Sequence, residues 1–275
     1  MSRWAAQLCW SILGTYVAIA VGVWCGLWGQ NYDLAGGPKW GGISSDYWLG
    51  TNLIGQDIFA RSLTSVATAL QTGLMVGGLA TMAGALAGAC AGYWRGRWPD
   101  RILLWLMGVI DAIPFVLLAA AIAYALGAQF IAVALAMILT LWVPVARLVR
   151  AETQKLRTMP YVESAQIIGV SPVLIILRHI LPNTWHLLMA QGLLVMVAAL
   201  KAEVVLSFLG IGSQASVSWG VMIAESTQEV ASGRFNNFLA ASIPLFGLVF
   251  VLGSLADFFQ SRRAGDSRAS GPMQA

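Results

Sequence analysis

Residues 160–183 read PYVESAQIIGVSPVLIILRHILPN, and this segment lies between two long apolar stretches. Pro160 suits the first turn of a helix, because the N–H that proline lacks has no partner there in any case. Glu163 falls in that first turn, where a carboxylate favours the helix N-terminus. Gly169 can adopt the left-handed conformation that ends a helix. The pattern therefore predicts a short helix that begins at Pro160 and ends before Gly169.

A second short helix is expected directly after the first. Ser171 and Pro172 are typical of an N-cap followed by a first-turn proline, and Leu181-Pro182 is expected to end this helix. A plain connecting loop would not need this much order. Basic residues flank the segment, namely Arg147, Arg150, Lys155, Arg157 and Arg178.

The composition places the chain in a membrane, because 58% of its residues are hydrophobic, 10% are charged and the mean hydropathy is +0.74. Few soluble domains have such values. Residues 4–30, 62–94, 112–146, 204–224 and 235–256 contain no Asp, Glu, Lys or Arg. A helix needs about 20 apolar residues to cross a bilayer. We expect an all-α polytopic membrane protein with six transmembrane helices, at roughly 6–28, 66–93, 102–126, 130–149, 185–209 and 236–259.

Positive charge indicates the orientation of these helices. With a cytoplasmic N-terminus, the outer side carries only Lys39, Arg61 and Arg234, and Lys201 lies within a span. Both termini are therefore expected in the cytoplasm. The net charge of +4 follows from this bias, and no basic stripe with stacking aromatic residues suggests nucleic-acid binding. The inner set is Arg3, Arg95, Arg97, Arg101, Arg147, Arg150, Lys155, Arg157, Arg178, Arg262, Arg263 and Arg268.

The chain is expected to form one membrane domain. We expect a transmembrane helix in 1–30, an outer segment at 31–65, and a core of five helices at 66–260. The core contains an ordered inner loop at 150–184, and the polar tail at 261–275 is predicted to be disordered. Residues 4–30 could also be read as a cleaved signal peptide, but their apolar run is longer than the usual signal core, so we expect an uncleaved span.

No catalytic site, metal site or nucleotide site is predicted. The three lysines complete no phosphate-binding loop of the G-x-x-x-x-G-K-[ST] type, and no G-x-S-x-G motif is present. Cys9, Cys25 and Cys90 are scattered over predicted spans, which argues against a disulfide framework or a metal site and favours buried thiols. If nucleotide hydrolysis drives transport, another chain must perform it.

Four segments resemble a known family. Glu163-Ser-Ala, Gly169 and the HILPN that begins at His179 are similar to the EAA loop of ABC-importer permeases. Residues 47–61 (YWLGTNLIGQDIFAR) and 206–220 (LSFLGIGSQASVSWG) resemble segments of the dipeptide/oligopeptide/nickel branch. The resemblance covers roughly residues 5–260. Departures from the family pattern include Ser164 for Ala, and Asn52, Gln56 and Ala60 for the usual Asp, Arg and Ser. They put the usual dipeptide substrate in question.

The resemblance implies a type I ABC importer in the bacterial inner membrane. Two related permease chains would form the path, one or two kinds of cytoplasmic ATPase subunit would bind ATP and Mg²⁺, and an external binding protein would deliver the solute. Closure of the ATPases would shift the permease between inward- and outward-facing states. The coupling residues that the resemblance implies are Glu163, Ser164, Ala165, Gly169, Arg178, His179, Leu181 and Pro182.

Four further residues are candidates for the translocation path. Asp111 lies inside a predicted span beside Pro114, where a carboxylate needs a protein or water partner; a structural partner on a neighbouring helix is favoured over a solute contact. Lys201 and Glu203 are two residues apart and cannot share a helix face. Lys201 could contact an anionic solute or extend to the outer surface. Trp142 is a tryptophan that could face the path.

The function that these observations favour is uptake of peptides or peptide-like solutes. Nickel-chelate uptake and uptake of an antimicrobial peptide are alternatives within the same family. A self-contained secondary transporter is an alternative of another class, but it predicts an inverted repeat and ion-coupling groups in broken helices, neither of which is evident. A membrane anchor or assembly factor without a path is a third class, which the ordered basic loop disfavours.

Overall fold

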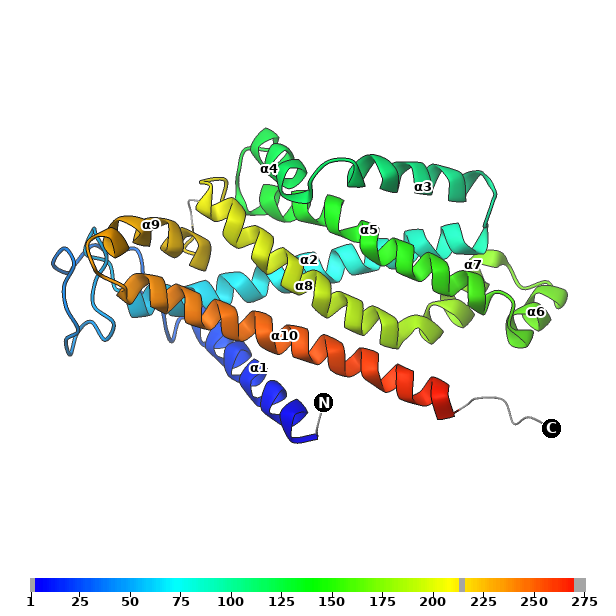
Figure 1. Ribbon diagram of the computed structural model, residues 1–275, viewed down its shortest axis with the longest axis horizontal. Coiled ribbons are helices and arrows are strands. Elements are labelled where there is room, and N and C mark those ends of the chain that lie inside the picture. Colours follow the sequence, from blue (N-terminus) through cyan, green and yellow to red (C-terminus); the bar gives the residue numbers. More distant parts are fainter. Residues whose placement is uncertain (1–2, 213–215, 270–275) are drawn as a thin grey trace.

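The computed structural model describes residues 3–212 and 216–269, with side chains at 4–212 and 216–260. These residues form a bundle of helices (Figure 1), and the one β-bridge among them joins Thr51 to Asp57. The helices are α1 (Arg3–Trp24), α2 (Ile58–Tyr93), α3 (Trp98–Asp111), α4 (Phe115–Ala125), α5 (Phe130–Leu156), α6 (Pro160–Ile167), α7 (Pro172–Ile175), the π-helix η1 (Ile176–Ile180), the 3₁₀-helix η2 (Pro182–Thr184), α8 (Trp185–Phe208), α9 (Trp219–Ala231) and α10 (Asn236–Ala269).

Helices α1, α2, α5, α8 and α10 contain the apolar segments that are long enough to cross a membrane. Figure 1 shows α2, α5, α8 and α10 running along the long axis of the molecule, with α1 against α2 and α10. Tyr16 of α1 donates a hydrogen bond to the carbonyl of Pro244 in α10 at 2.8 Å. The prediction of an all-α membrane fold is confirmed.

The third predicted span is wrong as a single helix over 102–126. The chain forms α3 and α4 instead, and their axes differ in direction by 91° across a break of a few residues. Pro114 causes the break, because it has no N–H to donate and it disfavours helical geometry at the preceding residue. Its ψ of 126° is extended, and its carbonyl accepts hydrogen bonds from the first turn of α4. The bent pair makes a sixth span if it is counted as one.

Two helix boundaries and the environment of one cysteine also differ from the predictions. Helix α2 begins at Ile58, inside the segment expected to lie outside the membrane up to residue 65, because the Asp57 carboxylate caps it by accepting from the Phe59 N–H at 2.9 Å. Helix α10 continues to Ala269, through most of the tail predicted to be disordered, and 270–275 lie outside the described residues. Cys25 lies beyond the end of α1 and is exposed rather than buried.

Helices α2 and α5 are in close contact through glycines spaced four residues apart. A Cβ at Gly84 would lie 2.6 Å from the carbonyl oxygen of Trp142, and one at Gly92 would lie 2.6 Å from that of Arg150. Gly88 would meet the backbone of Ala146 in the same way. Small residues at this spacing let two helix backbones approach in a membrane. These glycines therefore let α2 and α5 pack backbone to backbone.

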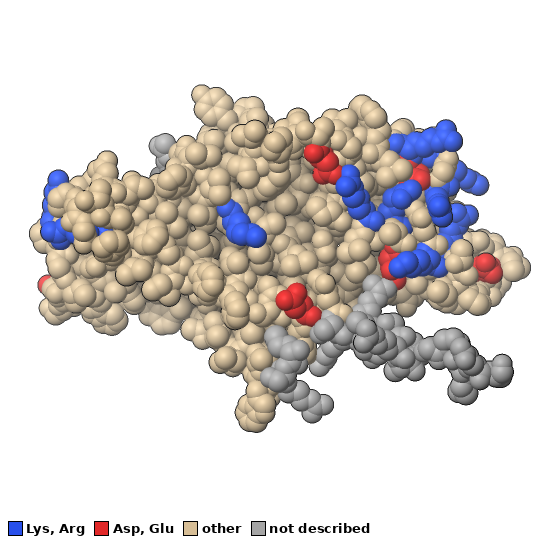
Figure 2. Space-filling model, viewed as in Figure 1, with Lys and Arg blue, Asp and Glu red and all other residues tan. Residues whose placement is uncertain are grey.

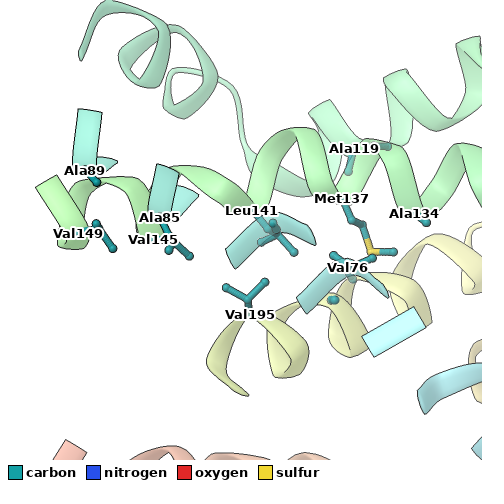
Figure 3. Close-up of a cluster of buried hydrophobic side chains, with 14 of the residues drawn as sticks. Val76, Ala85, Ala89, Ala119, Ala134, Met137, Leu141, Val145, Val149 and Val195 are labelled. Carbon is teal, nitrogen blue, oxygen red and sulfur yellow. The ribbon is translucent and has the colours of Figure 1, made fainter. Parts of the chain in front are cut away.

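The main core lies around this contact. Figure 3 shows Ala85 and Ala89 of α2 against Val145 and Val149 of α5, with Val195 of α8 on the other side. These side chains are almost fully buried. The glycines bring α2 and α5 together, and the buried side chains of the core hold α5 in position. The position of α5 in turn determines where the segment that follows it begins.

Charged side chains gather at the two ends of the molecule (Figure 2), and the face between them is mostly uncharged. We call the end that carries α6 and the α2–α3 loop the basic end, and the end that carries 25–57 and α9 the opposite end. This distribution agrees with the bias read from the sequence, although the side chains of Arg3, Arg262, Arg263 and Arg268 lie outside the described residues. The elements at the basic end carry Arg95, Arg97, Arg101, Arg150, Lys155, Arg157 and Arg178.

Candidate functional site

Helix α6 forms as the sequence predicts, at the basic end of the molecule (Figure 1). Pro160 is its first residue and Glu163 lies in its first turn. Gly169 has a φ of +87° and ends the helix, and the Ser171 hydroxyl caps α7 by accepting from the Leu174 N–H at 3.4 Å. The prediction of two short helices in this segment is confirmed.

The second short helix does not end at Leu181-Pro182, in contrast to the prediction. Leu181 N–H donates to the carbonyl of Ile176 at 2.9 Å, so the chain passes from α7 through one π-helical stretch and a 3₁₀ turn into α8. Pro182 has no N–H, and a π-bulge accommodates this loss without ending the helical path. A near-continuous helical segment therefore connects Pro172 to Phe208.

Helix α6 has one buried and one exposed face. Val162 and Ala165 are buried in the main core, so α6 is anchored to the bundle. Ile167 and Ile168 are 87% and 81% exposed, the highest values among the large apolar side chains of this segment. We call the exposed group Glu163, Ser164, Ile167, Ile168 and Gly169 the α6 surface.

The predicted coupling residues do not all share that surface. Ala165 points into the core, and Ser164 donates its hydroxyl hydrogen to the carbonyl of Pro160 at 2.8 Å. Arg178 is exposed and His179 is partly buried, and the His179 carbonyl accepts from the amide of Asn183 at 2.6 Å. Leu181 is partly buried beside the core and Pro182 is exposed.

The four predicted path residues do not lie together. Asp111, at the end of α3, forms an ion pair with Arg147 of α5, as the preference for a structural partner on a neighbouring helix predicts. Trp142 is partly buried between two core clusters and donates to the carbonyl of Leu139 in its own helix at 3.0 Å. The structure does not bring these residues together with Lys201 and Glu203.

Lys201 and Glu203 lie on opposite sides of α8, as their spacing predicts. Lys201 is exposed, whereas Glu203 is 9% exposed and accepts a hydrogen bond from the Ser207 hydroxyl at 2.6 Å. Glu203 also borders a small cavity of about 20 Å³ between α2, α5 and α8, which Thr72 and Ser218 line as well. A cavity of this size can hold about one water molecule.

A buried polar cluster at the opposite end was not predicted. We call it the polar clamp, and it consists of Asn52, Gln56, Arg61, Glu225 and Glu229. Arg61 is buried and bonds Gln56 and, at 2.7 Å, the Glu225 carboxylate. The Asn52 amide donates to Gln56 at 2.9 Å, and Glu229 accepts from the Leu53 N–H at 2.9 Å. The clamp ties the segment before α2 to α9.

Burial is the main influence on the Glu229 carboxyl, and it raises the pKa of this group above the ordinary value. The hydrogen bond from the Leu53 N–H opposes this rise, as does the charge of Arg61, whereas the charge of Glu225 adds to it. The one sequence signal for the clamp was the set of departures at Asn52 and Gln56. Its acidic partners follow more than 160 residues later, so no local pattern connects them.

Comparisons with known proteins identify the family. Residues 80–265, more than half of the chain, match the binding-protein-dependent transport system inner membrane component family. The chain is 33% identical over 193 residues to the dipeptide transport system permease protein DppC of Bacillus subtilis, which covers 70% of this chain and 60% of that protein. It is 36% identical over 213 residues to the glutathione transport system permease protein GsiD of Shigella flexneri, covering 77% and 70%. The oligopeptide transport system permease protein OppC of B. subtilis is 28% identical over 218 residues, covering 78% and 71%.

These matches agree with the membrane-spanning helices and with the EAA-like loop on an exposed short helix. This chain therefore belongs to the family of inner membrane components of binding-protein-dependent transport systems.

Proposed function

We propose that this chain is one of two permease subunits of a binding-protein-dependent ABC importer and forms half of a translocation path for peptides or peptide-like solutes. Membership of the family supports the transport role, and relatives named for dipeptides, glutathione and oligopeptides support the solute class. A second permease subunit, an external binding protein and cytoplasmic ATPase subunits would complete the assembly. The ATPase subunits would bind ATP and Mg²⁺.

The observation that carries this proposal is the α6 surface. Ile167 and Ile168 are almost fully exposed on a short helix that lies outside the membrane-spanning segments, at the end where basic residues gather. Exposed apolar side chains of this kind mark a site for a partner protein. Burying one of them contributes about 1.5–3 kcal/mol. We assign this surface to the docking of an ATPase subunit, with Glu163 as its charged contact.

The connection from this surface to the bundle supports a coupling role. Val162 and Ala165 hold α6 against the core, and the helical path from α7 continues into α8. A displacement of α6 by a closing ATPase would therefore move α8 with it. Such a movement favours one of two permease states over the other, which is how nucleotide binding can drive transport.

The charge distribution supports an orientation with the basic end in the cytoplasm of a bacterium. The positive-inside rule places the side richer in Lys and Arg there. The protein would then be a multi-pass protein of the inner membrane with both termini in the cytoplasm. This orientation gives α6 access to cytoplasmic ATPases and leaves α9 with the polar clamp on the outer side.

Co-purification tests the proposal. The chain, tagged and extracted in mild detergent from cells that express it with its neighbouring genes, is expected to bring down a second permease and ATPase subunits. Ile168→Asp should weaken ATPase retention at least about tenfold, because a buried apolar contact is replaced by a charge. Ile54→Asp is the matched control, since Ile54 is an exposed isoleucine at the opposite end. A wild-type chain that purifies without any ATPase, or equal loss in both variants, would contradict the proposal.

A further inference from the structure

Helix α8 carries an exposed strip that a lipid environment does not explain. The strip follows one side of the helix at intervals of three and four residues, which is the spacing of one helix face. Lys201, Val205 and Phe208 are exposed and the other members are partly exposed. The strip consists of Gln191, Leu194, Ala198, Lys201, Val205 and Phe208.

Lys201 is a charged residue within a membrane-spanning helix. Seven residues separate it from the end of α8, so it lies about 10 Å inside that end. Lys201 is exposed and is the one Lys or Arg in the sequence of α8, and the face between the two charged ends is mostly uncharged (Figure 2). A charged side chain at this depth is costly in lipid and is normally directed to protein or water.

The direction of α8 disfavours extension of the Lys201 side chain to the nearest membrane surface. Side chains on an α-helix lean toward its N-terminus. Helix α8 begins at the basic end and runs toward the opposite end, so the Lys201 side chain leans back toward the centre of the membrane. The surface nearest to Lys201 lies in the other direction.

No carboxylate within the described part of the chain pairs with Lys201. Glu203 is the nearest acidic residue in sequence, but it lies on the opposite face of α8 and is bonded to Ser207. The described ion pairs of the chain involve other cations, namely Arg61, Arg147, Arg150 and Lys155. The charge of Lys201 is therefore available to a group from outside this chain.

We propose that the α8 strip lines the translocation path and that Lys201 binds a carboxylate of the passing solute. This inference rests on the proposed function, since peptides and peptide-like solutes carry carboxylates. Gln191, about three turns nearer the basic end on the same strip, offers a second polar contact along the path. Ala198 between them leaves space for a solute against the helix.

Cysteine labelling of the assembled importer in proteoliposomes tests whether the α8 strip is accessible to water. In a chain with Cys9→Ala, Cys25→Ser and Cys90→Ala, we expect Lys201→Cys to react with a water-soluble methanethiosulfonate reagent in at least one nucleotide state. Phe246→Cys is the control, because Phe246 is 73% exposed on the membrane-spanning part of α10 and should face lipid. Reaction at Phe246→Cys alone, or at neither position, would overturn the inference by placing Lys201 in lipid or in a dry subunit contact.

A second measurement tests the anion-binding role without knowledge of the solute. Val205→Cys lies one turn from Lys201 on the same strip, and its labelling rates are compared for an anionic sulfonate reagent and a cationic trimethylammonium reagent of the same class. Replacing Lys201 by Gln in this background should lower the anion-to-cation rate ratio about tenfold, from Coulomb interactions over about 6 Å in water. An unchanged ratio would overturn the role of Lys201.

The same preparation separates this inference from the proposed function. Gel analysis of each proteoliposome sample shows whether the second permease and the ATPase subunits are present. Their presence with an unreactive Lys201→Cys refutes the α8 path alone. Their absence from the wild-type preparation refutes the importer assignment itself.

Discussion

At the opposite end of the molecule Arg61 is buried and bonded to Gln56 and Glu225, whereas at the basic end Ile167 and Ile168 are more than 80% exposed. Polar groups are therefore inside at one end and apolar groups are outside at the other. A buried polar cluster stabilises a fixed arrangement within one chain. An exposed apolar surface leaves binding free energy for a partner. The contrast indicates a structural role for the clamp and supports the docking role that we propose for the α6 surface.

The largest effect on stability is expected from Arg61→Ala. This change removes one of the two donors to the buried Gln56 oxygen, which keeps Asn52, and the ion pair with the partly exposed Glu225 carboxylate, and it should cost about 2–3 kcal/mol and lower the melting temperature of the purified chain. Lys39→Ala removes an exposed cation from the same end and should change stability by less than about 0.5 kcal/mol. Equal melting temperatures for the two variants would contradict a structural role for the clamp.

A smaller loss is expected inside α6, at its anchor. Val162 is fully buried, so Val162→Ala removes two methyl groups from the core and should cost about 2 kcal/mol. Ile167→Ala, on the exposed side of the same helix, should leave the stability of the isolated chain almost unchanged. The measurement is thermal unfolding of both variants in detergent. A larger loss for Ile167→Ala would show that the α6 surface packs within this chain.

The clamp should also make stability depend on pH through Glu229. Because its pKa is raised in the folded protein, the folded state retains the proton more strongly than the unfolded state does. The stabilisation is fully present below the unfolded-state pKa and is lost as the pH rises through the folded-state pKa. We expect the melting temperature at pH 4.5 to exceed that at pH 7.5 by a larger margin in wild type than in Glu229→Gln. Glu163→Gln, at the basic end, is the matched control, and an equally altered pH profile in it would refute this assignment.

The smallest effect on stability, with a large effect on function, is expected at the α6 surface. Glu163→Arg changes an exposed side chain, and Gly169→Asp places a residue that tolerates positive φ at an open position. Both variants should insert and fold, with stability changes within about 1 kcal/mol. Both should hydrolyse ATP without solute uptake in reconstituted importers. Coupled uptake at the wild-type rate in both variants would contradict the docking assignment.

Local signals were sufficient where neighbouring residues determine the conformation. Pro160, Gly169 and Ser171 act through their own backbone geometry and nearby N–H groups, so the start and end of α6 and the start of α7 were predictable. The end at Pro182 was not predictable, because a π-helical hydrogen bond over five residues compensates for the missing N–H. The 91° bend at Pro114 was missed for a related reason, since a proline in an apolar run can kink a helix or break it.

The sequence by itself determined the membrane class, most of the helical spans, the charge asymmetry and the family resemblance, because apolar length, charge counts and short motifs are properties of contiguous residues. Only the tertiary structure decided which side chains meet across long separations. It joined Arg61 to Glu225, placed the glycines of α2 against the backbone of α5, and turned Lys201 outward while Glu203 faces the interior. Those contacts depend on how helices pack and rotate against each other, and periodicity along one helix does not specify its neighbours.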